Sequence, residues 1–271
     1  MPPDSSRPPT PSTVNASFTL PIGNASLNAS VQLPAGRTTF TQLLPIIQNL
    51  ENAIVERVSD EAGKLGRPIS CRAGCGACCR QMVPVSLFEA EALSNWLATL
   101  PEDRMAALRE RFHQALSALS DAGVINTILD EKWLLDEESG TQLAVDYFHA
   151  GVPCPFLENE SCSIHPIRPL SCREYLVTSS PELCKDPSIH EISGVRLPLR
   201  LSRAVYLLGQ QLTNDRRGWI PLVFLLAWTK SGAKPGDFVA GPGPEVFRNF
   251  LDKVSASAGS DAAVPGPSES S

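Results

Sequence analysis

The chain has 271 residues, of which 42% are hydrophobic and 19% are charged, and its formal net charge is −6. A chain of this length can bury a substantial core, so it does not need the disulfide staples of small secreted domains. The acidic balance argues against sequence-independent nucleic-acid binding, which requires a basic face. No apolar run approaches the roughly 20 residues needed to cross a bilayer, and no signal peptide is visible at the start. We therefore expect a cytoplasmic protein that binds neither nucleic acid nor membrane.

Both ends of the chain are poor in residues that can be buried. Residues 1–13 consist mainly of Pro, Ser and Thr, and residues 255–271 are rich in Ser, Ala, Gly and Pro. Such composition predicts disordered tails. The remaining residues, 14–254, are expected to form a single domain.

A short internal repeat opens this domain. Residues 15–21 and 28–34 both begin Asn-Ala-Ser and end Leu-Pro, and apolar residues alternate with polar ones in each copy. Alternation of this kind is typical of half-buried strands, and two neighbouring copies predict a β-hairpin.

Helical patterns occupy most of the rest. The longest predicted helix runs from Thr38 to about Lys64, because its apolar residues recur at helical spacing. A capping box at Ser86 predicts a helix to Leu97, and Pro101 begins another whose stripe includes Leu108 and Phe112. Further helices are predicted near the following residues: 124–135, 200–213 and 244–254.

Two other segments have a less regular pattern. The apolar run 219–228 predicts a buried helix with Pro221 in its first turn, and the acidic run 130–138 predicts a solvated helix face and loop. Strands are expected only in the hairpin, around residues 192–199, and beside each group of cysteines. The predicted fold is therefore mainly α with small β elements (α+β), in which cysteine-rich irregular loops hold a metal site.

All eight cysteines lie in two groups. The first group is Cys71, Cys75, Cys78 and Cys79, and the second is Cys154, Cys162, Cys172 and Cys184. Gathering thiolates is costly unless a cation or an iron–sulfur cluster absorbs their charge, so this spacing indicates metal ligands. Disulfides are the alternative for an even number of cysteines, but they suit exported proteins. All eight cysteines are therefore candidate metal ligands.

The two groups are expected to share one site. Because adjacent side chains point in different directions, we expect either Cys78 or Cys79 to face elsewhere and the second group to complete the coordination shell. Residues 159–161 resemble a hairpin turn that would bring Cys154 and Cys162 together. Four arginines stand beside the cysteines and either offset thiolate charge or are simply solvated: Arg72, Arg80, Arg168 and Arg173.

The ordered cysteine pattern resembles a known family. The pattern C-x3-C-x2-C-C from Cys71 is followed by C-P-F-L, C-S-I and R-P-x-x-C-R-E-Y. Over residues 70–185 it is similar to the YkgJ-type or CxxCxxCC family, described as zinc- or iron-chelating proteins. The resemblance carries the family's cysteine positions to seven residues and its second signature to three others. These are Cys71, Cys75, Cys78, Cys79, Cys154, Cys162 and Cys172, with Arg168, Pro169 and Arg173.

Two residues stand apart from the family pattern. Cys184 lies beyond the core motif. His165 replaces an aromatic residue that is usual in the family, and it could be an extra ligand because neutral imidazole suits both zinc and iron. Seven or eight thiolates exceed one zinc site, which favours an iron–sulfur cluster over zinc.

Three functions are compatible with such a site. A closed site would stabilise the fold, or would stabilise a surface of this protein that binds a protein partner. An open site would support chemistry. The cysteine-cluster region resembles part of a flagellin lysine N-methylase, and this resemblance implies a metal-dependent enzyme that modifies a protein substrate. Its acid or base candidates are Glu174, Tyr175 and His165. The third alternative is a radical S-adenosylmethionine enzyme, because the spacing Cys71-x3-Cys75-x2-Cys78 matches. Against it stand Ala77, where that family has an aromatic residue, and the absence of strand–helix alternation. Whether the protein is an enzyme stays open at this level.

Overall fold

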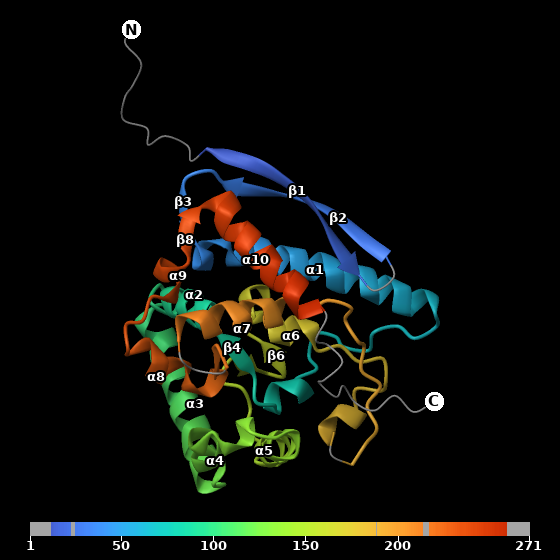
Figure 1. Ribbon diagram of the computed structural model, residues 1–271. Helices are drawn as coiled ribbons and strands as arrows, with labels where there is room; N and C mark the ends of the chain where they lie inside the picture. Colours follow the sequence, from blue (N-terminus) through green and yellow to red (C-terminus); the bar gives the residue numbers. More distant parts are fainter. Residues whose placement is uncertain (1–11, 23–24, 188, 214–216, 259–271) are drawn as a thin grey trace.

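The computed structural model describes residues 12–22, 25–187, 189–213 and 217–258 (Figure 1). Most of these residues are helical, and the strands form only antiparallel pairs, which confirms the predicted mainly α class. The predicted tails fall largely on residues 1–11 and 259–271, which lie outside the described residues.

The α-helices are α1 (Phe40–Lys64), α2 (Leu87–Leu97), α3 (Glu102–Asp121), α4 (Val124–Asp130), α5 (Glu137–His149), α6 (Leu170–Glu174), α7 (Leu201–Leu212), α8 (Leu225–Thr229), α9 (Pro235–Phe238) and α10 (Gly243–Ala258). Short 3-10 helices are η1 (Ala77–Arg80), η2 (Lys132–Leu134), η3 (His165–Ile167), η4 (Leu183–Lys185) and η5 (Leu222–Phe224). The strands are β1 (Thr13–Ile22), β2 (Ala25–Pro34), β3 (Arg37–Thr39), β4 (Pro84–Ser86), β5 (Leu157–Glu158), β6 (Ser161–Cys162), β7 (Trp219–Pro221) and β8 (Ala240–Pro242). They pair as β1–β2, β3–β8, β4–β7 and β5–β6.

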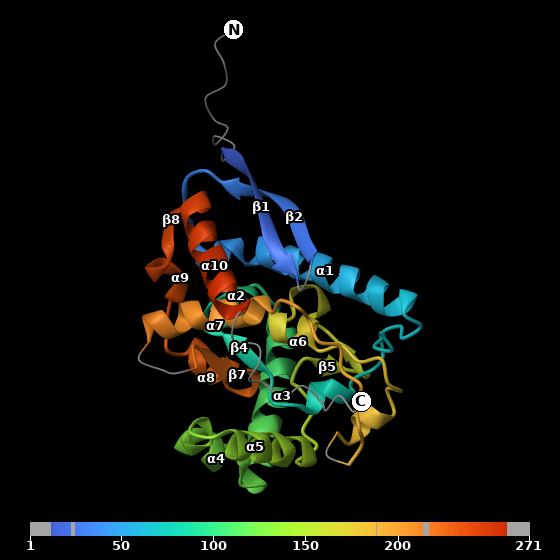
Figure 2. The same ribbon diagram turned by 45° about the vertical axis from the view of Figure 1, so that its right-hand side comes forward.

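The predicted N-terminal hairpin is confirmed. Strands β1 and β2 pair along their whole length, from Thr13 opposite Pro34 onwards. The hairpin lies over α1 and α10 (Figures 1 and 2). Its alternate residues face those helices: Leu33 is buried, and the Phe18 ring meets Phe247 of α10 edge to face at 5.3 Å. The apolar residues at every second position therefore mark the face of the hairpin that packs on the core.

The long helix α1 forms the floor under the hairpin. Thr39 caps it by accepting a hydrogen bond from Gln42 N–H, and the Gln42 side chain accepts from Thr39 N–H in return. All seven apolar residues of the predicted stripe are buried: Phe40, Leu43, Leu44, Ile47, Leu50, Ile54 and Val58. The first six pack with residues of α2, α7 and α10 in the largest core cluster, and Val58 packs with Leu176 and Leu197 in a smaller one. The predicted capping box of α2 is also confirmed, with Ser86 and Glu89 as its reciprocal partners.

A second helical layer extends away from the hairpin. Helix α3 descends to α4 and α5 at the far end of the molecule (Figure 2). Helix α5 was not predicted; it begins because Asp136 accepts a hydrogen bond from Ser139 N–H at 2.7 Å. The acidic residues Glu137 and Glu138 are exposed in its first turn, where negative charge favours the helix dipole. The acidic run is thus a solvated helix start, as expected.

Two sequence-based predictions are wrong. Residues 219–228 do not form one helix, since β7, η5 and α8 follow one another there. Pro221 has no N–H group and lies opposite Pro84 in a two-stranded sheet, where that donor is not needed. Around residues 192–199 the described chain has only a single β-bridge, between Val177 and Gly194, in place of a strand.

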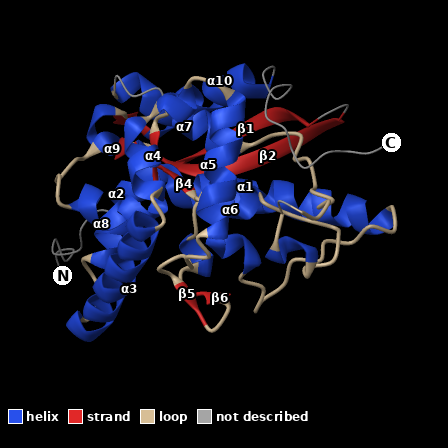
Figure 3. Cartoon of the chain, turned by 90° about the horizontal axis from the view of Figure 1, so that it is seen from below, coloured by secondary structure: helices blue, strands red, loops and turns tan. Residues whose placement is uncertain are grey.

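Long irregular segments gather on one side of the helices. Seen from below in Figure 3, the loops lie beside α6 and the far end of α1, with the small β5–β6 hairpin at their edge. Three cysteines lie in irregular loops, namely Cys71, Cys75 and Cys154, and the others lie in short helical turns or in β6. Within the described ranges, no helix combines the length and the hydropathy of a membrane span.

Candidate metal centre

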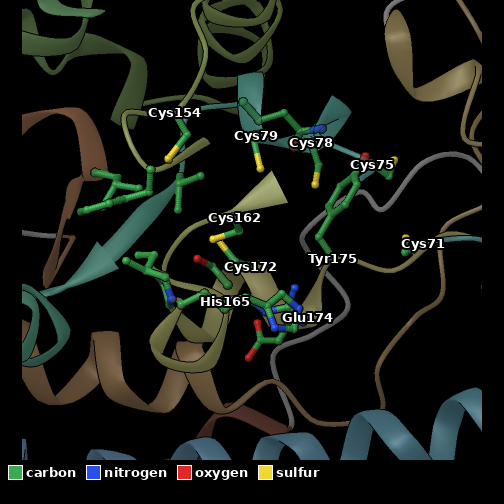
Figure 4. Close-up of a pocket in the computed structure, with 18 of the residues that line it drawn as sticks. Cys71, Cys75, Cys78, Cys79, Cys154, Cys162, His165, Cys172, Glu174 and Tyr175 are labelled. Atoms are coloured by element: carbon green, nitrogen blue, oxygen red, sulfur yellow. The ribbon is translucent and has the colours of Figure 1, made fainter. Parts of the chain in front are cut away.

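Seven of the eight cysteines line one cavity of about 750 Å³. They are Cys71, Cys75, Cys78, Cys79, Cys154, Cys162 and Cys172. All eight cysteines are free thiols. Figure 4 shows the thiols of both groups around this cavity, with Cys71 set apart at one side. The fold therefore brings together two segments about eighty residues apart in the chain.

The first group is carried by a tight turn. Gly74 has a φ of +84°, which glycine adopts without strain, and the chain then enters η1 with Cys78 and Cys79 on it. We expected one of these two thiols to face elsewhere, and this prediction is wrong because both line the cavity. The Cys79 thiol hydrogen bonds to the Cys78 sulfur, so the 3-10 turn holds neighbouring sulfurs close together.

The second group begins with a miniature hairpin, as predicted. Strands β5 and β6 place Leu157 opposite Cys162, and Asn159 and Glu160 both have positive φ in the turn between them. Two residues with positive φ are typical of the type I′ hairpin turn. Cys154 precedes this hairpin and Cys172 lies on α6. Three thiols of the second group therefore lie in three different local structures: a loop, a strand and a helix.

Direct contacts hold the two groups together. The Cys154 N–H donates to the Cys79 carbonyl at 2.7 Å. The Arg80 guanidinium binds both carboxylate oxygens of Glu160, at 2.8 and 3.1 Å, which fastens η1 to the β5–β6 turn. Gly76 allows this approach, since a Cβ atom there would lie 2.4 Å from the Glu160 Oε2 atom. A main-chain hydrogen bond and an ion pair therefore join the two cysteine segments that form the walls of the cavity.

The thiols differ in acidity. A hydrogen bond from Cys79 lowers the pKa of Cys78 to about 7, and the positive charge of Arg168 contributes to this shift. Burial raises the pKa of Cys154 to about 12 and raises the pKa of Cys172 well above the usual range. Burial also raises the pKa of Cys71. Near neutral pH, Cys78 is thus the thiol most readily deprotonated among these four, and metal binding would have to displace protons from the others.

The four neighbouring arginines have different roles. Arg80 is committed to Glu160, and Arg72 is exposed. Arg173 is buried and donates hydrogen bonds to Asn52 Oδ1, Pro166 O and Arg168 O, at 2.7, 2.6 and 3.1 Å. Arg173 therefore fixes the loop before α6, whereas the Arg168 side chain lines the cavity.

Beneath the cavity lie three buried carboxyl groups. Glu174 accepts hydrogen bonds from Ser202 N–H at 2.8 Å and from the Ser202 hydroxyl at 2.5 Å, and burial raises its pKa to about 7. Glu89 Oε1 accepts from Leu170 N–H at 2.7 Å, which anchors the start of α6. Burial also raises the pKa of Glu51 well above the usual range. These carboxyl groups join α1, α2, α6 and α7 under the thiols.

Sequence reasoning named some of these residues and missed others. Glu174, Tyr175 and His165 were named as acid or base candidates, and all three line the cavity. Arg200 and Tyr206 also line it but were not identified, because no cysteine stands near them in the chain. Glu51 was missed as well, although its position on the apolar stripe of α1 was a signal for burial.

Cys184 and His165 occupy different surroundings. Cys184 does not line the cavity; it is buried in a small cluster with Val177 and Ile192, and burial raises its pKa to about 11. His165 is exposed at the cavity's edge, and its pKa is lowered by burial of the ring and by the charges of Arg168 and Arg173. A lowered pKa keeps imidazole neutral, the form that binds metals.

The donor chemistry suits a thiophilic metal. Seven thiols on one cavity match the ligand preference of zinc and of iron–sulfur clusters. As they stand, no three His, Cys, Asp or Glu side chains of the described residues converge closely enough to share a metal ion. Holding one would therefore require thiol rotamers or the irregular loops to shift, which is common for sites that metal binding itself organises.

The comparison with protein families agrees with the cysteine pattern. Residues 70–191 match the family model CxxCxxCC, described as "Putative zinc- or iron-chelating domain". The resemblance drawn from the sequence is thereby confirmed for this segment, somewhat under half of the chain. No curated protein and no solved structure matches the chain.

Proposed function

We propose that the CxxCxxCC segment binds its metal through the seven cysteines that line the cavity, with an iron–sulfur cluster as the favoured occupant. The single observation that carries this proposal is that thiols from two distant segments meet at one cavity whose walls are hydrogen bonded to each other. Neither group would then hold the metal alone.

The number of thiols favours a cluster over one zinc ion. A structural zinc site uses four ligands, whereas seven thiols line this cavity. The adjacent sulfurs of Cys78 and Cys79 also suit a polynuclear centre better than one small ion. Arg168 supports the proposal because its positive charge would offset a negatively charged thiolate centre.

Metal analysis of protein purified without oxygen tests the proposal. We expect iron and acid-labile sulfide in similar amounts, with a brown absorption band near about 400 nm. Colourless protein that contains zinc would retain the chelating role and overturn the cluster.

Matched cysteine variants test the ligand set. We expect Cys172→Ser to lose most of its metal, since Cys172 lines the cavity, and Cys184→Ala to retain it, since Cys184 does not. Cys172 is partly buried and Cys184 is buried, so thermal unfolding of the two variants controls for general destabilisation. Full metal content in Cys172→Ser would contradict the proposed ligand set.

A further inference from the structure

The cavity is larger than a metal centre requires. Its volume of about 750 Å³ lies in the range of about 300–1,000 Å³ that is typical of small-molecule sites. A thiolate-bound metal lies only about 2.3 Å from its sulfurs, so it would fill the thiol end alone. Besides the thiols, the cavity is lined by apolar side chains such as Phe156, Leu176 and Leu222, and by polar ones that include Arg168, Arg200 and Glu174.

Two guanidinium groups that line the cavity form no direct ion pair with a carboxylate of the described residues. The Arg168 Nε atom is buried without a hydrogen-bond partner, and its side chain pairs with no carboxylate of the described residues. Arg200 also lines the cavity; no carboxylate of the described residues forms a direct ion pair with it, although its charge acts on the buried Glu51 and Glu174. A buried donor without an acceptor is costly, and its presence calls for a water, an ion or a ligand.

We propose that the cavity binds a small organic acid beside the thiol cluster, with its apolar body against the Phe156 wall and its acidic group on Arg168 and Arg200. Guanidinium groups bind carboxylate and phosphate through paired, charge-assisted hydrogen bonds. An apolar wall with a few polar groups is the usual composition of such a pocket. The inference rests on the proposed function in one respect: the metal occupies the part of the cavity where the thiols lie.

Thiolates are the competing acceptors for Arg168. Arg168 lines the same cavity as Cys162 and Cys172, and its positive charge acts on both thiols, so thiolates there can accept its hydrogen bonds. Arg200 is different, because it stands at the start of α7, outside the cysteine segments, and its charge acts on the buried carboxyl groups Glu51 and Glu174. Arg200 therefore separates binding of an organic acid from charge balance of the metal centre.

Isothermal titration calorimetry with three matched probes tests the inference. The probes are 1-naphthoate, 1-naphthyl phosphate and the uncharged 1-naphthalenemethanol, added to the full chain with metal and after metal removal. We expect one or both anions to bind about tenfold more tightly than the alcohol. Arg200→Gln should weaken the better anion by about tenfold, leave the alcohol unchanged and leave the metal content unchanged. The preferred anion distinguishes a carboxylate ligand from a phosphate ligand.

The controls make each outcome decisive. Arg37→Gln replaces an exposed arginine on β3 and should bind all probes like the unaltered chain. Equal affinity for the anions and the alcohol, or unchanged anion binding in Arg200→Gln, would overturn the inference. Metal content measured on the same samples tests the proposed function separately: metal-loaded protein without anion preference contradicts the inference alone, and metal-free protein with the preference contradicts the metal proposal alone. If Arg168→Gln loses metal, the anion affinity of Arg200→Gln still tests whether the cavity binds an organic acid.

Discussion

At the scale of single residues, neighbouring thiols in one cavity have opposite acid–base character. Cys78 accepts a hydrogen bond from Cys79 and has a pKa of about 7, while burial raises the pKa of Cys154 to about 12. The difference arises from partners and burial, because a free cysteine has a pKa near about 8.5. Cys78 is thus deprotonated more readily than Cys154 in the same cavity.

Selective alkylation checks this difference. In metal-free protein at pH 7, we expect iodoacetamide to modify Cys78 before Cys71, although the Cys71 residue is more exposed. The reason is that the pKa of Cys78 is lowered to about 7, whereas partial burial of the Cys71 sulfur raises its pKa. Tandem mass spectrometry of tryptic peptides resolves the two: cleavage at Arg72 separates Cys71 from the peptide that carries Cys75, Cys78 and Cys79, and fragmentation of that peptide locates the modified cysteine. Arg168→Gln should slow the reaction of Cys78. Faster modification of Cys71 would contradict the assignment.

Glu174 predicts how stability depends on pH. Its pKa of about 7 in the folded protein exceeds the usual unfolded value, so the folded state holds the proton more tightly. The free energy of unfolding should therefore fall as pH rises from 5 to 8, with a contribution from this carboxyl group of about 2 kcal/mol. Glu174→Gln should reduce that fall, because the amide does not ionise in this pH range and can still hydrogen bond to Ser202.

Urea unfolding at pH 5 and pH 8 measures this effect. Glu56→Gln serves as the control because Glu56 is exposed on α1 and should not change the pH dependence. A fall of equal size in Glu174→Gln and in the unaltered chain would show that this carboxyl group is not responsible.

At the scale of elements, the hairpin is joined to the core through α10. Phe247 is only 2% exposed and contacts both Phe18 and Phe250, whereas Phe238 on α9 is 79% exposed. We expect Phe247→Ala to lower the free energy of unfolding by about 3–5 kcal/mol and Phe238→Ala to change it by less than about 0.5 kcal/mol.

Metal content should be the same in both phenylalanine variants. Phe247 belongs to the core beneath the hairpin and does not line the thiol cavity. Chemical denaturation and metal analysis of the same samples check both parts. Loss of metal in folded Phe247→Ala would show that the hairpin supports the metal centre directly.

Elements with strong periodic patterns could be predicted from the sequence, and short ones could not. The hairpin and α1 were predicted because their apolar residues keep one period over many positions. Residues 219–228 were misread because an apolar run has no period to distinguish a strand from a helix, and pairing of Pro221 with Pro84 is a tertiary event. Helix α5 was missed because its start depends on a single capping residue, Asp136.

The candidate site was predictable in composition but less so in arrangement. The spacing of the cysteines indicated a shared metal centre, and seven of them line one cavity. The arrangement of Cys78 and Cys79 was misjudged, since a 3-10 turn brings adjacent side chains closer than a strand would. Arg200 could not be identified, because only folding brings the start of α7 to the thiols.

At the scale of the whole molecule, metal binding should protect the loops. The two cysteine segments belong to irregular chain between well-packed helices, so opening of these loops need not unfold the core. We expect metal to slow trypsin cleavage after the exposed Arg72 by at least about tenfold, because the metal binds only the closed form.

Cleavage at Arg109 provides the internal control. Arg109 is exposed on α3, away from the cavity, so its cleavage should respond little to metal. Peptide mapping over time follows both sites in one experiment. Equal protection at Arg72 and Arg109 would indicate stabilisation of the whole fold instead of the loops.

The direct bond from Cys154 to Cys79 also has a consequence for biosynthesis. The first four cysteines leave the ribosome about ninety residues before Cys172, which at about 5–20 residues per second is a delay of roughly 5–20 s. For most of that interval the leading thiols have no partner segment in the nascent chain, because Cys154 follows Cys79 by 75 residues. Delivery of metal to a growing chain would therefore meet an incomplete ligand set, and the centre is expected to be filled only after translation has passed α6.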